Sequence, residues 1–354
     1  MGVLRTAKLS TLGLGKSVGL FDALGRSDWR KNQLLILGYH GVSQHDEHHW
    51  NPDLYVSPEY FRSRMTLLKK YGCNVLPLAE ALQRLWARTL PPCSVALTFD
   101  DGFCDFYNHA FPILREFGWS ATVYLTSYYS LYNRPVFDVM CSYLLWKGRR
   151  AVIDARGLIN GTHTLDLRTE STRAAATVAL RKFARDAKYS AADKDELLTA
   201  LAERLSIDYE AILSKRILHL LTADELAELA AEGIDIQLHT HRHYLPNKRE
   251  SFLCELEENR NFIRRFTKSP HHFCYPNGVY EAGKEAWLRE SNVASATTCE
   301  PGLATDHSHR YRLPRLVDTS TLQLIELEGW ISGFSKFLPH KPTRGEHLIP
   351  PFYY

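Results

Sequence analysis

The stretch Leu97-Thr98-Phe99-Asp100-Asp101-Gly102 organises the rest of the chain. The apolar run Val95–Phe99 predicts a buried strand, and it ends abruptly in two carboxylates and a glycine. Adjacent aspartates repel each other, and burial disfavours the ionised form of both. The pair therefore needs a cation or a shared proton, unless it is only the acidic turn that Asp-Gly commonly forms.

Strands and helices alternate on both sides of this stretch. Apolar runs predict strands at 34–40, 74–77, 95–99, 121–125, 234–238, 272–275, 293–297 and 313–317. Helical patterns lie between most of them, so the order predicts parallel strands with helices outside. We therefore expect an α/β fold with a parallel sheet.

A segment at about 127–220 interrupts the alternation. It contains an aromatic loop, a hairpin-like stretch and several helical patterns, and it is too long for an ordinary loop. We interpret it as a mainly helical insertion. The insertion could pack against the outside of the barrel, or it could act as a lid or substrate platform. The sequence does not distinguish these two roles.

The ends of the chain carry weaker patterns. We expect a loosely docked or disordered lead-in at 1–33, with a weak amphipathic surface anchor at Leu4–Leu24 as the alternative. The barrel is expected at 34–320 and an irregular tail at 321–354.

Composition limits the classes of function. Hydrophobic residues make up 45% and charged residues 23%, which is typical of a globular protein. A net charge of +3 argues against a nucleic-acid partner. Seven cysteines without a Cys-x-x-Cys pair favour reduced thiols, and no apolar window is long enough for a transmembrane span. We expect a cytoplasmic location, with membrane association as the alternative.

Polar side chains follow the predicted strands. His40, Asp100-Asp101, His239–His243 and Pro276-Asn277-Gly278 all come directly after apolar runs, and in a parallel barrel such positions share one face. His239 and His243 are four residues apart, which places both imidazoles on one side of a helical turn and directs His241 elsewhere. With one aspartate they form a two-His, one-carboxylate set that suits catalytic zinc.

These motifs resemble the polysaccharide deacetylases, the NodB-homology group also called carbohydrate esterase family 4. Thr98-Phe99-Asp100-Asp101-Gly102 resembles the family's first motif, and His239-Thr240-His241-Arg242-His243 resembles the second. Tyr275-Pro276-Asn277-Gly278 is similar to the loop of the third motif. Ile36–Val42 and Leu313–Val317 resemble an opening and a late strand, so the likeness runs from about residue 34 to 317 outside the insertion.

The resemblance implies a distorted (β/α) barrel and roles for individual residues. Asp101, His239 and His243 would bind a divalent metal, with Zn²⁺ the expected ion, and Asp100 would be the general base. We assign substrate binding to His40 and to the loop Tyr275-Pro276-Asn277-Gly278. The expected partner is an N-acetylated glycan or a lipid-linked sugar.

The sequence departs from the family pattern at two places. Cys274 stands where the third motif often carries an arginine that orients the base, and Arg315 or Arg312 could replace it. The late Leu-x-His that supplies the general acid is not evident. His307, His309 and His340 are the candidate replacements.

The leading hypothesis is a metal-dependent hydrolase that removes N-acetyl groups from hexosamine units. A non-catalytic glycan-binding protein, a deformylase and an O-acetyl esterase are the alternatives from the same resemblance. A glycoside hydrolase is disfavoured because its two carboxylates flank the scissile bond at least about 5 Å apart. A non-haem iron oxygenase shares the ligand set and would be identified by O₂ consumption.

Overall fold

A parallel sheet of eight strands forms the centre of the protein. The computed structural model describes residues 3–278 and 280–340. The strand order is β11-β10-β9-β6-β5-β1-β12, and β4 pairs with the start of β5. The strands are β1 (Leu35–Tyr39), β4 (Asn74–Val75), β5 (Ser94–Phe99), β6 (Thr122–Leu125), β9 (Asp235–Leu238), β10 (His272–Cys274), β11 (Ser295–Thr297) and β12 (Leu316–Val317).

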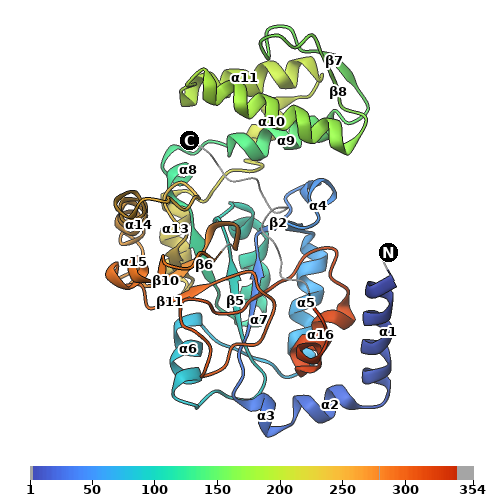
Figure 1. Ribbon diagram of the computed structural model, residues 1–354, viewed down its shortest axis with the longest axis vertical. Helices are drawn as coiled ribbons and strands as arrows, with labels where there is room; N and C mark the ends of the chain where they lie inside the picture. The colour runs from blue at the N-terminus through green and yellow to red at the C-terminus, as the bar shows by residue number, and fades with distance from the viewer. Residues whose placement is uncertain (1–2, 279, 341–354) are drawn as a thin grey trace.

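The sheet curls into a distorted barrel (Figure 1). Each pair of neighbouring strands in it is parallel. The two edges approach each other through a parallel bridge between Thr297, at the end of β11, and Leu313, just before β12. The expected (β/α) barrel is therefore confirmed.

Burial on both faces explains why the strands are continuous apolar runs. All residues of β1 and β5 are buried, because the barrel interior packs against one face of each strand and helices cover the other. The covering helices are α5 (Pro58–Lys70), α6 (Leu78–Trp86), α7 (Phe111–Phe117), α13 (Ala223–Ala231), α14 (Arg249–Ile263) and α15 (Glu285–Glu290). Ser57 caps α5 by accepting a hydrogen bond from the Tyr60 amide, as Ser-Pro predicts.

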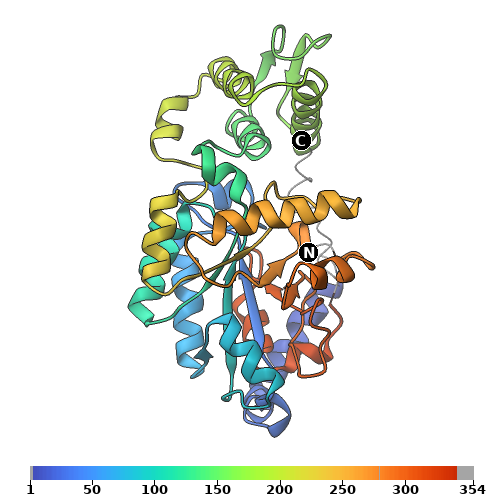
Figure 2. The same cartoon turned by 90° about the vertical axis from the view of Figure 1, so that its left-hand side faces the viewer.

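The insertion forms a separate layer over one end of the barrel (Figures 1 and 2). Its elements are α8 (Ser127–Tyr132), α9 (Phe137–Lys147), the antiparallel pair β7 (Val152–Asp154) and β8 (Thr164–Asp166), α10 (Glu170–Asp186), α11 (Ala191–Arg204) and α12 (Tyr209–Ser214). Buried leucines and aromatics of the insertion form a hydrophobic cluster, which Leu54, Tyr55 and Phe103 of the barrel side join. The mainly helical insertion is confirmed.

A short loop structure on the barrel side faces this layer. Strand β2 (Gly41–Val42) follows β1 and pairs with β3 (Tyr55–Val56). Helix α4 (Glu47–Trp50) lies in the connection between these two strands. Helix α4 contacts α9 of the insertion. Because β2 follows the carboxyl end of β1, the insertion covers the barrel end at which active sites form in this architecture.

The N-terminal segment differs from the expected loose lead-in. It forms α1 (Val3–Ser17), α2 (Leu20–Gly25) and α3 (Asp28–Lys31), and Figure 1 shows α1 beside α16 (Leu324–Ser332). Lys8 and Lys16 form ion pairs with buried glutamates of α16, at 3.0 and 2.6 Å. The expectation was wrong because these partners lie more than 300 residues away along the chain.

The expected irregular tail is also partly helical. Residues 324–332 form α16, and Phe334–Phe337 form a 3-10 turn, η3. Trp330 and Leu327 are buried, so packing on the barrel stabilises a segment whose own pattern is weak. Residues 341–354 lie outside the described part of the chain. In the described ranges no helix has the length and apolarity that crossing a membrane requires.

Candidate active site

The carboxyl ends of the strands bring the predicted polar residues together. His40 follows β1, Asp100-Asp101 follow β5, His239 follows β9, and Tyr275 follows β10. Arg315 directly precedes β12, which pairs with β1 in parallel. Residues that are far apart in the sequence thus meet at one end of the barrel.

Asp101, His239 and His243 form a compact cluster of metal-ligand type. The Nε2 atoms of His239 and His243 lie 3.2 and 3.1 Å from Oδ1 of Asp101. Their ligand atoms lie within 4.8 Å of one another, and all three residues are buried. A divalent ion held by three such atoms fits between them.

Two observations support this fit. Both carboxylate oxygens of Asp101 are buried without a hydrogen-bond donor among the described residues, an arrangement that is costly unless a cation compensates it. The Nδ1 atom of His239 is 2.8 Å from the carbonyl oxygen of Cys274. Donation from Nδ1 to that carbonyl leaves Nε2 with a lone pair for a metal.

The backbone reaches this geometry through strained conformations. Asp101, Thr240 and His243 have φ of 68°, 65° and 59°, in the left-handed region that non-glycine residues rarely adopt. The expected helical turn at 239–243 is therefore wrong, because the segment is an irregular loop. The imidazoles of His239 and His243 still converge, and His241 points away to Ser127, 2.8 Å from its Nδ1.

Asp100 is held by Arg315. The guanidinium donates two hydrogen bonds to the two carboxylate oxygens, each 2.6 Å long, and Arg315 is fully buried. Gly38 makes room for it, since a Cβ there would lie 3.1–3.2 Å from three side-chain atoms of Arg315. Arg312, the other candidate, pairs instead with Glu300 at the surface.

The two aspartates have different electrostatic environments. Burial alone raises the pKa of Asp100, but the charge and hydrogen bonds of Arg315 outweigh it and hold the pKa below its usual value. For Asp101 burial acts in the same direction, and His243 and His239 together hold its pKa well below the usual range. Both carboxyls are therefore ionised at neutral pH.

His40 lies beside Asp100. Its Nε2 is 3.7 Å from Oδ2 of Asp100, and the side chain is buried. Burial lowers the pKa of His40, against the opposing effect of Asp100. The imidazole is thus neutral in the free protein and placed to exchange a proton with Asp100.

The loop after β10 has two parts. Tyr275 has no exposed surface, and its hydroxyl donates to the carbonyl of Tyr311 at 2.9 Å, while Pro276 is also buried. Asn277 and Gly278 are partly exposed and have positive φ. Substrate binding by this loop stays a prediction, and the burial of Tyr275 and Pro276 shows that these two residues also anchor the loop.

The histidines suggested as replacement acids lie away from Asp100. His307 is 83% exposed and faces Asp306, and His309 faces Glu285. His340 packs on Trp330. None of the three contacts Asp100 in the described part of the chain.

Helix α14 supports the histidine loop, and sequence reasoning missed this role. Asn259, fully buried, accepts a hydrogen bond from the His239 amide and donates to the carbonyl of Leu125. Glu255 accepts from the Arg242 amide at 2.8 Å. Glu255 and Asn259 are four residues apart, which places both polar side chains on one face of a helix that also has apolar residues. This spacing is the one sequence signal that could have indicated their supporting role.

Comparisons with known proteins identify the family. The family model described as polysaccharide deacetylase matches residues 87–190 and 198–294, more than half of the chain. The matched residues include Asp100, Asp101, His239 and His243. The chain belongs to the polysaccharide deacetylase family.

Individual relatives match shorter regions. The chain is 30% identical over 99 residues to the poly-beta-1,6-N-acetyl-D-glucosamine N-deacetylase of Escherichia coli, covering 28% of this chain and 14% of that protein. It is 25% identical over 173 residues to the protein of the same name from Staphylococcus epidermidis, covering 44% and 59%. The match thus spans less than two thirds of each relative.

A solved structure extends the likeness of the fold. The Streptococcus pyogenes deacetylase PplD, in complex with acetate, superposes with a TM-score of 0.55 at 18% identity. The superposition covers 83% of this chain and 96% of that one. At this identity the likeness supports the fold alone.

Proposed function

We propose that the protein is a metal-dependent carbohydrate N-deacetylase that removes acetyl groups from hexosamine units of a glycan. The observation that carries this proposal is the position of the Asp100–Arg315 pair directly beside the cluster of Asp101, His239 and His243. The names of the two curated relatives support N-acetylglucosamine as the sugar. A glycoside hydrolase does not fit, because its carboxylates must flank the bond that is broken.

One carboxylate and two imidazoles form a ligand set that suits zinc. When bound, the ion would polarise the amide carbonyl as a Lewis acid and lower the pKa of water. Asp100 lies beside this position and accepts the proton of the attacking water. Arg315 holds both oxygens of Asp100, so the carboxylate keeps one orientation and stays ionised before the reaction. The products are acetate and the free amine of the sugar.

His40 completes the proton path in this proposal. The neutral imidazole takes the water's proton from Asp100 and donates it to the nitrogen of the leaving amine. This role replaces substrate binding as the main function that we assign to His40. It depends on the 3.7 Å separation between His40 Nε2 and Asp100 Oδ2.

Acetate release from N-acetylglucosamine oligomers tests the proposal. We expect turnover by the wild type, loss of it with chelator, and recovery when zinc is added back. Asp100→Asn and His40→Gln should each lower the rate about 10²–10⁴-fold, the usual contribution of an acid or base. Asp306→Asn, which changes a surface carboxylate paired with Arg88, is the matched control.

Each other outcome would support an alternative. Binding of oligomers without acetate release, unchanged by Asp100→Asn, would indicate a glycan-binding module. Release of formate from N-formyl sugars in preference to acetate would indicate a deformylase. Turnover that chelator does not affect would exclude the metal. The cytoplasmic location stays a prediction, which fractionation of cells would test.

A further inference from the structure

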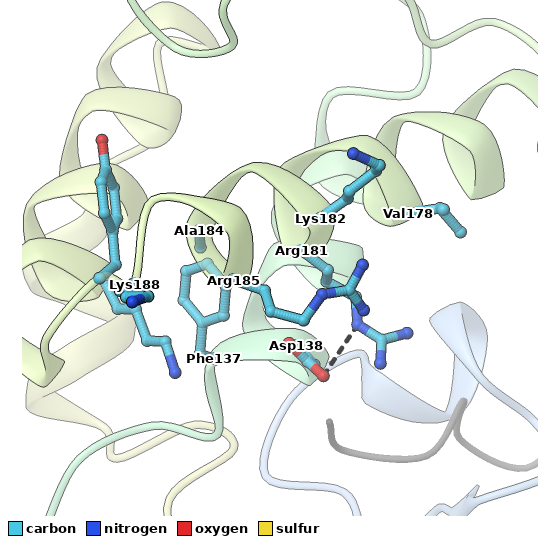
Figure 3. A pocket seen from close by; sticks show the side chains of 10 residues that line it. Phe137, Asp138, Val178, Arg181, Lys182, Ala184, Arg185 and Lys188 are labelled. Atoms are coloured by element: carbon cyan, nitrogen blue, oxygen red, sulfur yellow. Dashed lines mark ion pairs between the residues drawn. The ribbon is translucent and has the colours of Figure 1, made fainter. Parts of the chain in front are cut away.

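The insertion contains a basic groove between α9, α10 and the start of α11 (Figure 3). Its volume is about 600 Å³. Five cationic side chains line it: Arg181, Lys182, Arg185, Lys188 and Lys194. Two aromatic residues, Phe137 and Tyr189, also line it, and the Lys194 ammonium lies 5.6 Å from the centre of the Phe137 ring.

Basic residues outnumber acidic ones among the described residues that line the basic groove. Asp138 is the one acidic residue of this described lining, and it pairs with Arg181 at 2.8 Å, the dashed contact in Figure 3. Lys182 and Arg185 share Asp186, which lies outside the lining, at 2.5 and 3.6 Å. The described lining therefore carries five basic side chains and one acidic one.

A second cavity connects the basic groove to the barrel. It has a volume of about 650 Å³ and shares Asp138 and Val178 with the groove, so the two adjoin. One wall comes from residues 49–54 and the other from α9 and α10. Trp50 and Trp146, both partly exposed, lie in opposite walls and offer indole surface of the kind on which sugar rings pack.

The two cavities therefore lead from the connection between β2 and β3 to the basic groove. Residues 49–54 belong to the connection between β2 and β3, just beyond His40. A glycan that reaches the barrel along the second cavity would place its far end in the basic groove. Neutral sugars gain nothing from a lining in which basic side chains outnumber acidic ones, whereas phosphate matches both the planar fork of arginine and the ammonium of lysine.

We infer that the basic groove binds a phosphate-bearing group of the glycan substrate and that the insertion is a substrate platform. The inference rests on the proposed deacetylase function. The phosphate can come from a diphosphate that joins the sugar to a lipid or from a phosphodiester within the glycan. Both sources present the same charged oxygens to Arg185 and Lys188, and the experiment separates them.

The test compares two double variants with the same change of charge. Arg185→Glu/Lys188→Glu reverses two exposed cations of the basic groove. Arg150→Glu/Lys215→Glu reverses two exposed cations of the insertion that do not line it. Unfolding curves of both variants establish that each keeps the fold.

Binding is measured first, in the Asp100→Asn background, so that it does not depend on turnover. The probes are inorganic pyrophosphate, an N-acetylglucosaminyl diphosphate lipid and an N-acetylglucosamine oligomer that carries glycerol phosphate. We expect the groove variant to weaken binding of the phosphorylated probes at least about tenfold, the loss of one to two charge-assisted contacts. The control variant should bind them as Asp100→Asn alone does.

Turnover then distinguishes the two hypotheses. We expect the groove variant to lose kcat/KM for the phosphorylated substrates while neutral oligomers are deacetylated at the original rate. The phosphorylated substrate, lipid-linked or glycan, that shows the larger loss of kcat/KM in the groove variant identifies the source of the phosphate. Equal weakening by the control variant, or no preference of the wild type for phosphorylated probes, would overturn the inference. Phosphate-dependent binding without deacetylation would retain the groove and reject the proposed function.

Discussion

Replacement of Arg315 by methionine tests the central pair of the site. Arg315 is fully buried, and its two hydrogen bonds to Asp100 are each 2.6 Å long. Removal of one partner leaves Asp100 as a buried charge without its cation, which costs about 3–5 kcal/mol. Loss of the bond from Arg315 Nε to the Thr298 carbonyl adds to the effect. Since total stabilities are of order 5–15 kcal/mol, the variant should unfold at a much lower urea concentration.

Arg312→Met is the matched control for this prediction. Arg312 also makes two bonds to a carboxylate, Glu300, but its side chain is 48% exposed. A surface pair of this kind contributes about 0–1 kcal/mol. The assay is urea unfolding followed by far-UV circular dichroism, with acetate release as the second readout.

A double-variant cycle completes the test. Asp100→Asn removes the charge that Arg315 neutralises, so Arg315→Met should cost much less in that background than in the wild type. Equal costs in the two backgrounds would refute the reasoning. So would a loss for Arg315→Met of less than about 1 kcal/mol, no larger than the loss for Arg312→Met.

Three further predictions follow from other contacts. Asp101→Asn should lower bound zinc in dialysed protein, measured by elemental analysis, whereas Asp100→Asn should retain it; equal metal loss in both would contradict the division of roles. Burial lowers the pKa of His272 from 6.5 to about 4, so the folded protein favours the neutral imidazole. The contribution of His272 to the free energy of unfolding is therefore greatest above pH 6.5 and declines as the pH falls towards 4. The loss is roughly 3 kcal/mol, and His272→Gln should flatten the dependence of the unfolding free energy on pH in this window; an unchanged slope would disprove it. The Sγ atoms of Cys73 and Cys93 are 2.8 Å apart, so oxidised glutathione should join them in a disulfide, seen as a linked peptide by mass spectrometry and absent from Cys73→Ser. Failure to link under conditions that oxidise other thiols would count against this contact.

The position of the site could be predicted from local patterns. Asp100-Asp101 and His239–His243 follow apolar runs, and parallel strands in a barrel share one active face, so their meeting follows from the alternation of elements. The structure places the side chains of Asp101, His239 and His243 together as this reasoning requires. The conformation of the loop at 239–243 did not follow, because spacing alone cannot show that Thr240 and His243 adopt positive φ.

The partners of the reacting residues were harder to predict. Arg312 lies two residues before Pro314 and Arg315 lies one residue after it, so either could have faced Asp100. Pairing of β12 with β1 beside Gly38 decides for Arg315. Asn259 gave no comparable signal, since its role depends on where α14 packs against the strand ends.

The sequence by itself determined the alternation of strands and helices, and with it the barrel, the insertion and the acidic and histidine motifs. Apolar periodicity and turn residues act over a few positions, so these features can be read along the chain. The tertiary structure alone decided which arginine holds Asp100, that His40 faces it, that the N-terminal helices pack on α16, and that five cations of the insertion line one groove. Each of these depends on contacts between residues distant in the chain, and their burial and distance exist only after the chain has folded.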